Sequence, residues 1–119
     1  MPTGDVDAYA LTQPTSLYPG FQQCFAGGFP SWQASELAAA QRPIALGALT
    51  EQSGPAAWHS IRSWALVGTE DQAIPEASQV AMATTAGSHI SYFRAPHFGL
   101  VDQPWKVAAV INHAVAATS

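Results

Sequence analysis

Two short apolar segments in the second half of this 119-residue chain constrain its fold more than any other feature. Residues 63–67 (SWALV) form a continuous run closed by Gly68, and residues 89–93 (HISYF) are rich in residues that favour strands. A continuous apolar run is typical of a parallel strand that is covered on both faces. Each segment is followed by a loop and then by a helical pattern. This repeated order of strand, loop and helix predicts an α/β fold with a short parallel pair of strands.

Proline and glycine mark the ends of the two helical patterns. Residues 75–86 begin with Pro75 and are followed by Gly87, the favoured placement of proline at a helix start and glycine just past its end. Pro104 opens a last helix over residues 105–117. The apolar stripe of that helix consists of Val107, Val110, Ile111 and Val115. These helices are expected to flank the strand pair.

The first half of the chain has a different character, with many glycine, proline, glutamine and aromatic residues. Short helical patterns occur over residues 14–25, 32–41 and 44–49, and Ser31 is expected to cap the second of them. Short helices joined by Gly/Pro turns are typical of a lid that lies across another surface. We therefore expect a cap-like helical segment over residues 1–56 and a βαβα unit over residues 57–119. At this length the two parts are expected to form one folding unit.

Charge and hydropathy exclude several classes of partner. Only 10% of the residues are charged, against roughly 25% in an average globular domain, so much of the surface must be apolar or weakly polar. The basic residues are scattered and form no stripe that could bind a phosphate backbone, which argues against nucleic acid. No apolar run approaches the roughly 20 residues of a membrane-spanning helix. The first residues lack the pattern of a secretory signal, so a cytoplasmic location is expected.

Cysteine and histidine usage argues against a metal site. The single cysteine, Cys24, allows neither an internal disulfide nor a multi-cysteine metal cage. No two of the four histidines have the spacing of metal ligands on a helix. No metal site is therefore expected.

Two loops carry the residues with the clearest chemical potential. The loop over residues 68–75 contains Asp71, and the loop over residues 95–99 contains His97. Both loops leave the carboxyl ends of parallel strands, which share the edge of the sheet where α/β proteins bind ligands. A carboxylate beside an imidazole fixes its tautomer and stabilises its protonated form. The alternative is structural: Asp71 would shape the turn before the helix at Pro75, and His97 would be an ordinary loop residue.

The same residues resemble a known family. Residues 66–75 (LVGTEDQAIP), followed by the isolated His97 before a terminal helix, are similar to the end of α/β-hydrolases. Residues 41–51 (QRPIALGALTE) resemble the cap segment of bacterial esterase-like members. The resemblance implies the C-terminal part of that fold, with Asp71 as triad acid and His97 as general base. The implied reaction is the hydrolysis of a small ester or acyl compound, and no cofactor is expected.

The nucleophile of that family is missing. Its serine lies in a G-x-S-x-G turn, and no such pattern occurs in this sequence. The serine would therefore come from outside this chain, and the chain alone is expected to be inactive. Phe21, Phe25 and Trp32 in the cap-like segment could line an acyl or aromatic substrate pocket, or could simply pack that segment onto the sheet.

A second function is also compatible with the sequence. Two parallel strands leave open edges, which proteins normally pair or cover. A short sheet with apolar helices and few charges would bury its open surface against a copy of itself or another chain. This predicts a non-catalytic binding protein, derived from a hydrolase, that forms a dimer or a complex with a partner chain.

Overall fold

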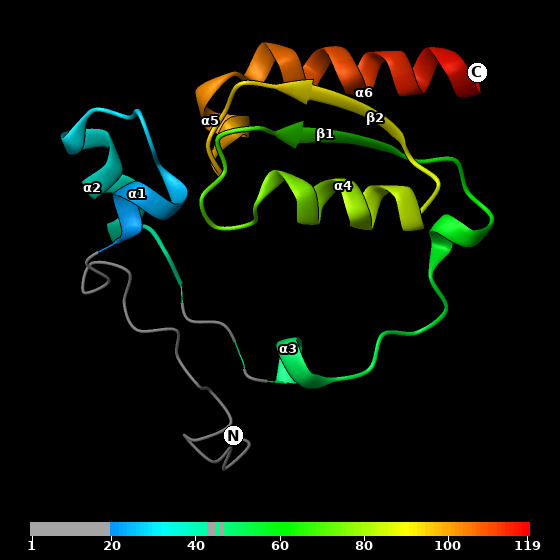
Figure 1. Ribbon diagram of the computed structural model, residues 1–119, viewed down its shortest axis with the longest axis horizontal. Helices are drawn as coiled ribbons and strands as arrows, with labels where there is room; N and C mark the ends of the chain where they lie inside the picture. The colour runs from blue at the N-terminus through cyan, green and yellow to red at the C-terminus, as the bar shows by residue number, and fades with distance from the viewer. Residues whose placement is uncertain (1–19, 43–44, 46) are drawn as a thin grey trace.

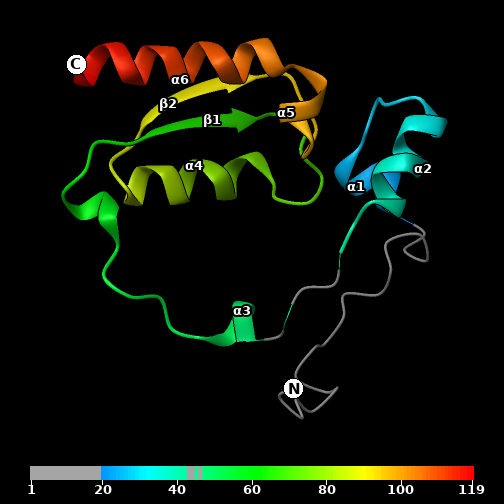
Figure 2. The same cartoon turned by 180° about the vertical axis from the view of Figure 1, so that it is seen from behind.

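The chain folds around a two-stranded parallel sheet with helices on both sides (Figure 1). This computed structural model describes residues 20–42, 45 and 47–119. Helix α4 (Glu76–Thr85) and helix α6 (Pro104–Thr118) lie on opposite sides of the strand pair, as the views in Figures 1 and 2 agree. The predicted α/β class with a parallel pair and flanking helices is therefore confirmed.

Strands β1 (Trp64–Gly68) and β2 (His89–Phe93) pair in register, with Trp64 opposite His89 and Gly68 opposite Phe93. The expectation that the first strand is covered on both faces holds only at its end. Val67 and Gly68 are buried, whereas the three residues before them are half-buried. The reason is that no third strand lies along the outer edge of β1 in the described part of the chain.

Helix α4 ends as its sequence predicts. Gly87 adopts a positive φ of 65°, which allows the Ser88 N–H to donate to the Ala83 carbonyl at 2.9 Å and the Gly87 N–H to donate to the Thr84 carbonyl at 3.0 Å. This pair of bonds satisfies carbonyl groups that the end of a helix otherwise leaves open. The chain can therefore turn directly into β2.

Helix α6 begins at Pro104, one residue earlier than predicted, and follows a short helix, α5 (Gly99–Asp102). Four residues are too few to show a helical period, so α5 could not be predicted from the sequence. No residue of α6 is fully buried. Val107 and Val110 of its predicted stripe are half-buried, and the other two residues of the stripe are exposed.

The first half contains α1 (Phe21–Phe25), α2 (Ser31–Ala39), α3 (Gly47–Thr50) and the short 3-10 helix η3 (Ala57–His59). Residues 14–19, 43–44 and 46 of the predicted helical patterns lie outside the described residues. Buried Ala26, Phe29 and Ala34 form a small core, against which Leu37 and Phe98 pack.

The prediction that Ser31 caps α2 is wrong. Pro30 holds the cap position, with φ −55° and ψ 143°, and Ser31 is the first helical residue. Because the proline side chain has no oxygen that could accept a hydrogen bond, no side-chain cap bond forms there. The Ser31 carbonyl instead accepts a hydrogen bond from Ser35 Oγ at 2.9 Å.

A search of the described helices for a candidate membrane span, by length and hydropathy, finds none.

Candidate active site

The two oxygens of the Asp71 carboxylate have separate partners. Oδ1 accepts hydrogen bonds from the backbone N–H groups of Ala73 at 2.8 Å and Ile74 at 2.9 Å, which closes the turn after β1. Oδ2 lies 3.0 Å from Nδ1 of His97. The side chain of Asp71 is only 8% exposed. The turn-forming role and the histidine-pairing role, which the sequence presents as alternatives, are therefore both filled by one residue.

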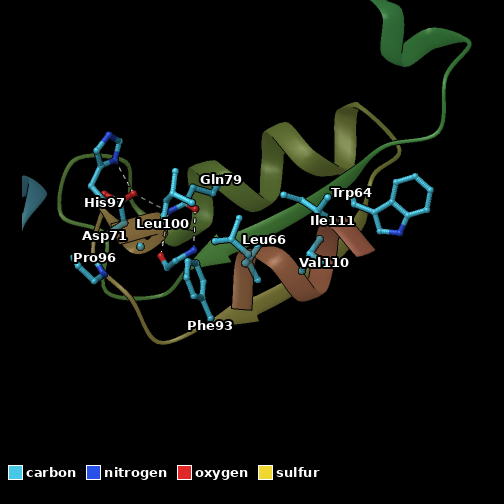
Figure 3. Close-up of a pocket in the computed structure, with 13 residues that line it drawn as sticks. Trp64, Leu66, Asp71, Gln79, Phe93, Pro96, His97, Leu100, Val110 and Ile111 are labelled. Atoms are coloured by element: carbon cyan, nitrogen blue, oxygen red, sulfur yellow. Dashed lines mark hydrogen bonds and ion pairs between the residues drawn. The ribbon is translucent and has the colours of Figure 1, made fainter. Parts of the chain in front are cut away.

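His97 lies where the chain leaves β2, directly after the buried residues Ala95 and Pro96. A carboxylate can only accept hydrogen bonds, so neutral His97 carries its proton on Nδ1 and leaves Nε2 as an acceptor. The imidazole is 33% exposed, and no described residue hydrogen bonds to Nε2. Figure 3 shows the second ring nitrogen pointing away from Asp71. The ring is thus set up to take a proton from a group that approaches from solvent.

Gln79 on α4 holds the loop that carries Asp71. Its Oε1 accepts from the Gly68 N–H at 3.1 Å, and its Nε2 donates to the Gly68 carbonyl at 3.1 Å and to the Ile74 carbonyl at 2.7 Å. The same Nε2 also lies 3.4 Å from Asp71 Oδ2, the longest of these contacts (Figure 3). The Gln79 amide therefore joins the end of β1, the carboxylate and the start of α4.

Two further contacts bring the two loops together. A Cβ atom at Gly68 would lie 2.9 Å from the carbonyl oxygen of Ala95, so only glycine lets β1 end this close to the His97 loop. Arg94 forms an ion pair with Glu70, which links one loop to the other. The hydrogen bond and the charge of Glu70 raise the pKa of the Arg94 guanidinium above its ordinary value. Because this pair is exposed, it positions the loops more than it stabilises them.

Aromatic residues from the cap-like segment pack beside His97. The Phe25 ring meets the imidazole edge-on, with 5.2 Å between ring centroids, and the Phe98 N–H donates to the Phe25 carbonyl at 3.0 Å. Phe21 is buried against Phe25 and Phe98. Trp32 is 65% exposed on α2. Phe25 is therefore the one predicted substrate-binding residue that the fold brings to the histidine.

A hollow of about 340 Å³ lies next to the Asp71–His97 pair, between β1, α6 and the two loops. Its lining includes Asp71, Gln79, Phe93, His97, Leu66 and Val110 (Figure 3). None of Phe21, Phe25 and Trp32 lines it. The apolar wall comes instead from β1, α5 and α6.

The other histidines and Asp102 stand apart from this site. His59 packs on Trp58 with 3.9 Å between ring centroids, and His89 stacks on Trp64 at 5.1 Å. Asp102 accepts a hydrogen bond from Gln103. Within the residues that the structure describes, no group of three or more His, Cys, Asp or Glu side chains could hold a metal ion.

Replacing Gln79 with leucine tests its role in this site. We expect Gln79→Leu to lower the free energy of unfolding by about 1–2 kcal/mol, because the backbone N–H and carbonyl of Gly68 lose their hydrogen-bond partner. Urea denaturation followed by circular dichroism gives the difference. Gln72→Leu is the matched control, since Gln72 is exposed in the loop that carries Asp71. Equal urea midpoints for the two variants would show that the hydrogen bonds of Gln79 do not stabilise the fold.

Chemically, the site can keep a proton on Nδ1 of His97 and accept another on Nε2. Within the described part of the chain no serine hydroxyl hydrogen bonds to His97. Comparison of the chain with protein-family models, with curated proteins and with solved structures finds no match.

Proposed function

We propose that this chain is the acid–base part of an α/β-hydrolase-like protein that hydrolyses a small ester or acyl compound. In this proposal residues 57–119 correspond to the C-terminal βαβα unit of that fold, and residues 1–56 to its cap. The serine nucleophile comes from outside the chain. The observation that carries the proposal is the 3.0 Å contact between Asp71 Oδ2 and His97 Nδ1, together with the open Nε2.

The reaction follows from this arrangement. As the incoming serine Oγ bonds to the ester carbonyl carbon, its proton passes to His97 Nε2. Asp71 stabilises the resulting imidazolium without itself taking the proton. When the tetrahedral intermediate collapses, the carbon–alkoxide bond breaks and the proton moves from Nε2 to the leaving alkoxide. Water then repeats the sequence on the acyl-serine and releases the acid.

The surroundings of the pair support this role. Asp71 is nearly buried and has no freedom to turn, because both of its oxygens are engaged. The adjoining hollow of about 340 Å³ is at the lower end of the usual size of small-molecule pockets, roughly 300–1,000 Å³. Its apolar wall suits a short acyl chain better than a charged one.

Supplying a serine tests the proposal. The chain is mixed with p-nitrophenyl acetate and an excess of N-acetylserinamide, and the O-acetylated serinamide is measured by mass spectrometry. We expect transfer a few-fold faster than with His97→Gln. This is far below the roughly 10²–10⁴-fold effect of a positioned general base, because this serine is free in solution. His113→Gln is the matched control, since His113 is exposed on α6. Equal rates for wild type and His97→Gln would contradict the role of His97.

A second measurement tests the external origin of the nucleophile. Intact mass after treatment with a fluorophosphonate is expected to show no stoichiometric adduct on the chain alone. An adduct that His97→Ala abolishes would mean that a serine of this chain is the nucleophile. The external-serine part of the proposal would then be wrong, while the role of His97 would stand.

A further inference from the structure

Among the residues that the structure describes, none hydrogen bonds to part of the backbone along the outer edge of β1. The His89 N–H donates to the Ser63 carbonyl at 2.9 Å, and the Thr69 N–H donates to the Phe93 carbonyl at 3.0 Å. Since the backbone groups of a strand alternate in direction, odd-numbered residues of this segment face β2 and even-numbered ones face outward. The N–H and C=O groups of Trp64, Leu66 and Gly68 therefore point away from β2.

Gln79 already occupies one end of this edge. Its side-chain amide binds both the N–H and the C=O of Gly68, each at 3.1 Å, as a neighbouring strand would. No described residue does the same for Trp64 and Leu66. Proteins usually cover or protect an exposed strand edge, and this edge carries no lysine or proline that would discourage pairing.

We propose that a second copy of this chain binds along this edge and extends the sheet across a twofold axis at Ala65. In the antiparallel arrangement Trp64 lies opposite Leu66 of the second copy, and Leu66 opposite its Trp64. Each N–H then meets a carbonyl of the other copy, and every open group of the two residues is satisfied. The ladder stops at Gly68, whose outward groups are held by Gln79.

Charge favours the antiparallel direction. Arg62 precedes β1, and Glu70 and Asp71 follow it, with no charged residue between them. Antiparallel pairing brings Arg62 of each copy toward the end of the other copy's strand, where two carboxylates outnumber the one guanidinium, that of Arg94, which pairs with Glu70. Parallel pairing would instead align like charges, which is unfavourable at close range.

The surface beside the edge fits the same partner. A second hollow of about 550 Å³, lined mainly by Ile61, Trp64, Val110, Ile111, Ala114 and Val115, continues the first one along α6. Figure 3 shows Trp64, Leu66, Val110 and Ile111 gathered along this side of β1. A twofold axis perpendicular to the sheet keeps both copies of α6 on one face of the extended sheet. The second hollow of one chain then lies beside the second hollow of the other. Ile111, which is 57% exposed in the single chain, would be covered there.

A cysteine at the proposed axis tests the register. Residues opposite each other without mutual hydrogen bonds have Cα atoms about 4.5 Å apart, which is within the range of a disulfide. In a Cys24→Ser background, we expect Ala65→Cys to form a disulfide-linked dimer under mild oxidation. Ser91→Cys is the matched control, because Ser91 is exposed on β2 away from the axis. No more cross-linking at residue 65 than at residue 91 would overturn the proposed register.

Sedimentation equilibrium tests the dimer itself. We expect Leu66→Lys to raise the dissociation constant at least about tenfold, because it places a like charge from each copy in the apolar groove. Tyr92→Lys at the outer edge of β2 should leave it unchanged, as should His97→Gln. Circular dichroism checks that each variant is folded. A wild-type chain that stays monomeric at every accessible concentration would overturn this proposal. The proposed function would not be affected, because its acyl-transfer test depends on His97 and not on the dimer.

Discussion

In the Asp71→Asn variant the ring proton of neutral His97 moves from Nδ1 to Nε2. The backbone N–H groups of Ala73 and Ile74 require an acceptor, so the new amide keeps its oxygen at the position of Oδ1. Its NH₂ group then takes the place of Oδ2, 3.0 Å from Nδ1 of His97. Two donors cannot face each other, so Nδ1 has to accept and Nε2 has to hold the proton. Such a ring cannot act as a general base toward an incoming serine.

Long-range ¹H–¹⁵N correlation spectra of the imidazoles distinguish the two tautomers directly. We expect acyl transfer to N-acetylserinamide to fall to the level of His97→Gln. In a complete serine hydrolase the corresponding loss is on the order of 10⁴-fold. Asp102→Asn is the control, because it removes a carboxylate that does not contact His97. An Nδ1–H tautomer that persists in Asp71→Asn would show that Asp71 does not orient the ring.

The Gly68→Ala variant is expected to lose about 1–3 kcal/mol of unfolding free energy, the usual cost of forcing extra atoms into a packed position. The added Cβ would lie 2.9 Å from the Ala95 carbonyl oxygen and 3.5 Å from that of Pro96. Both are backbone atoms and cannot rotate away. The end of β1 has to shift, which strains the Gln79 bonds and separates the loops of Asp71 and His97.

Urea denaturation measures this loss, and Gly54→Ala provides the matched control. A Cβ at Gly54 meets nothing within 4 Å, so that variant should stay within about 0.5 kcal/mol of wild type. The two variants share the same change in unfolded-state entropy, so their difference isolates the steric effect. If their midpoints coincide, the close approach of the two loops is not required for stability.

Much of the architecture of residues 57–119 follows from local signals. The two apolar segments predicted as strands match β1 and β2 to within a residue. The helix between them is predicted correctly too, because proline and glycine mark its two ends. The contact between Asp71 and His97, 26 positions apart, could be predicted since both follow parallel strands at one edge. Neither inference needs knowledge of side-chain packing.

Other features depend on three-dimensional packing that no local pattern carries. A glutamine in α4 has no special mark in the sequence, and the role of Gln79 arises only because β1 ends beside that helix. The stripe of α6 has the period of a buried face, yet Ile111 is exposed because the sheet beneath it has only two strands. Serine is a common helix N-cap, but the helix begins at Ser31 itself, and Pro30 holds the cap position.

The hydrogen bond between the Phe98 N–H and the Phe25 carbonyl has a consequence for how the molecule opens. The bond crosses from the cap-like segment to the residue next to His97, and the Phe25 ring rests on the imidazole itself. Local unfolding proceeds in cooperative units, and contacts of this kind help to hold a unit together. Fraying of α1 would therefore remove two contacts of the histidine loop, so the surroundings of the His97 ring depend on a helix more than 70 residues earlier in the sequence.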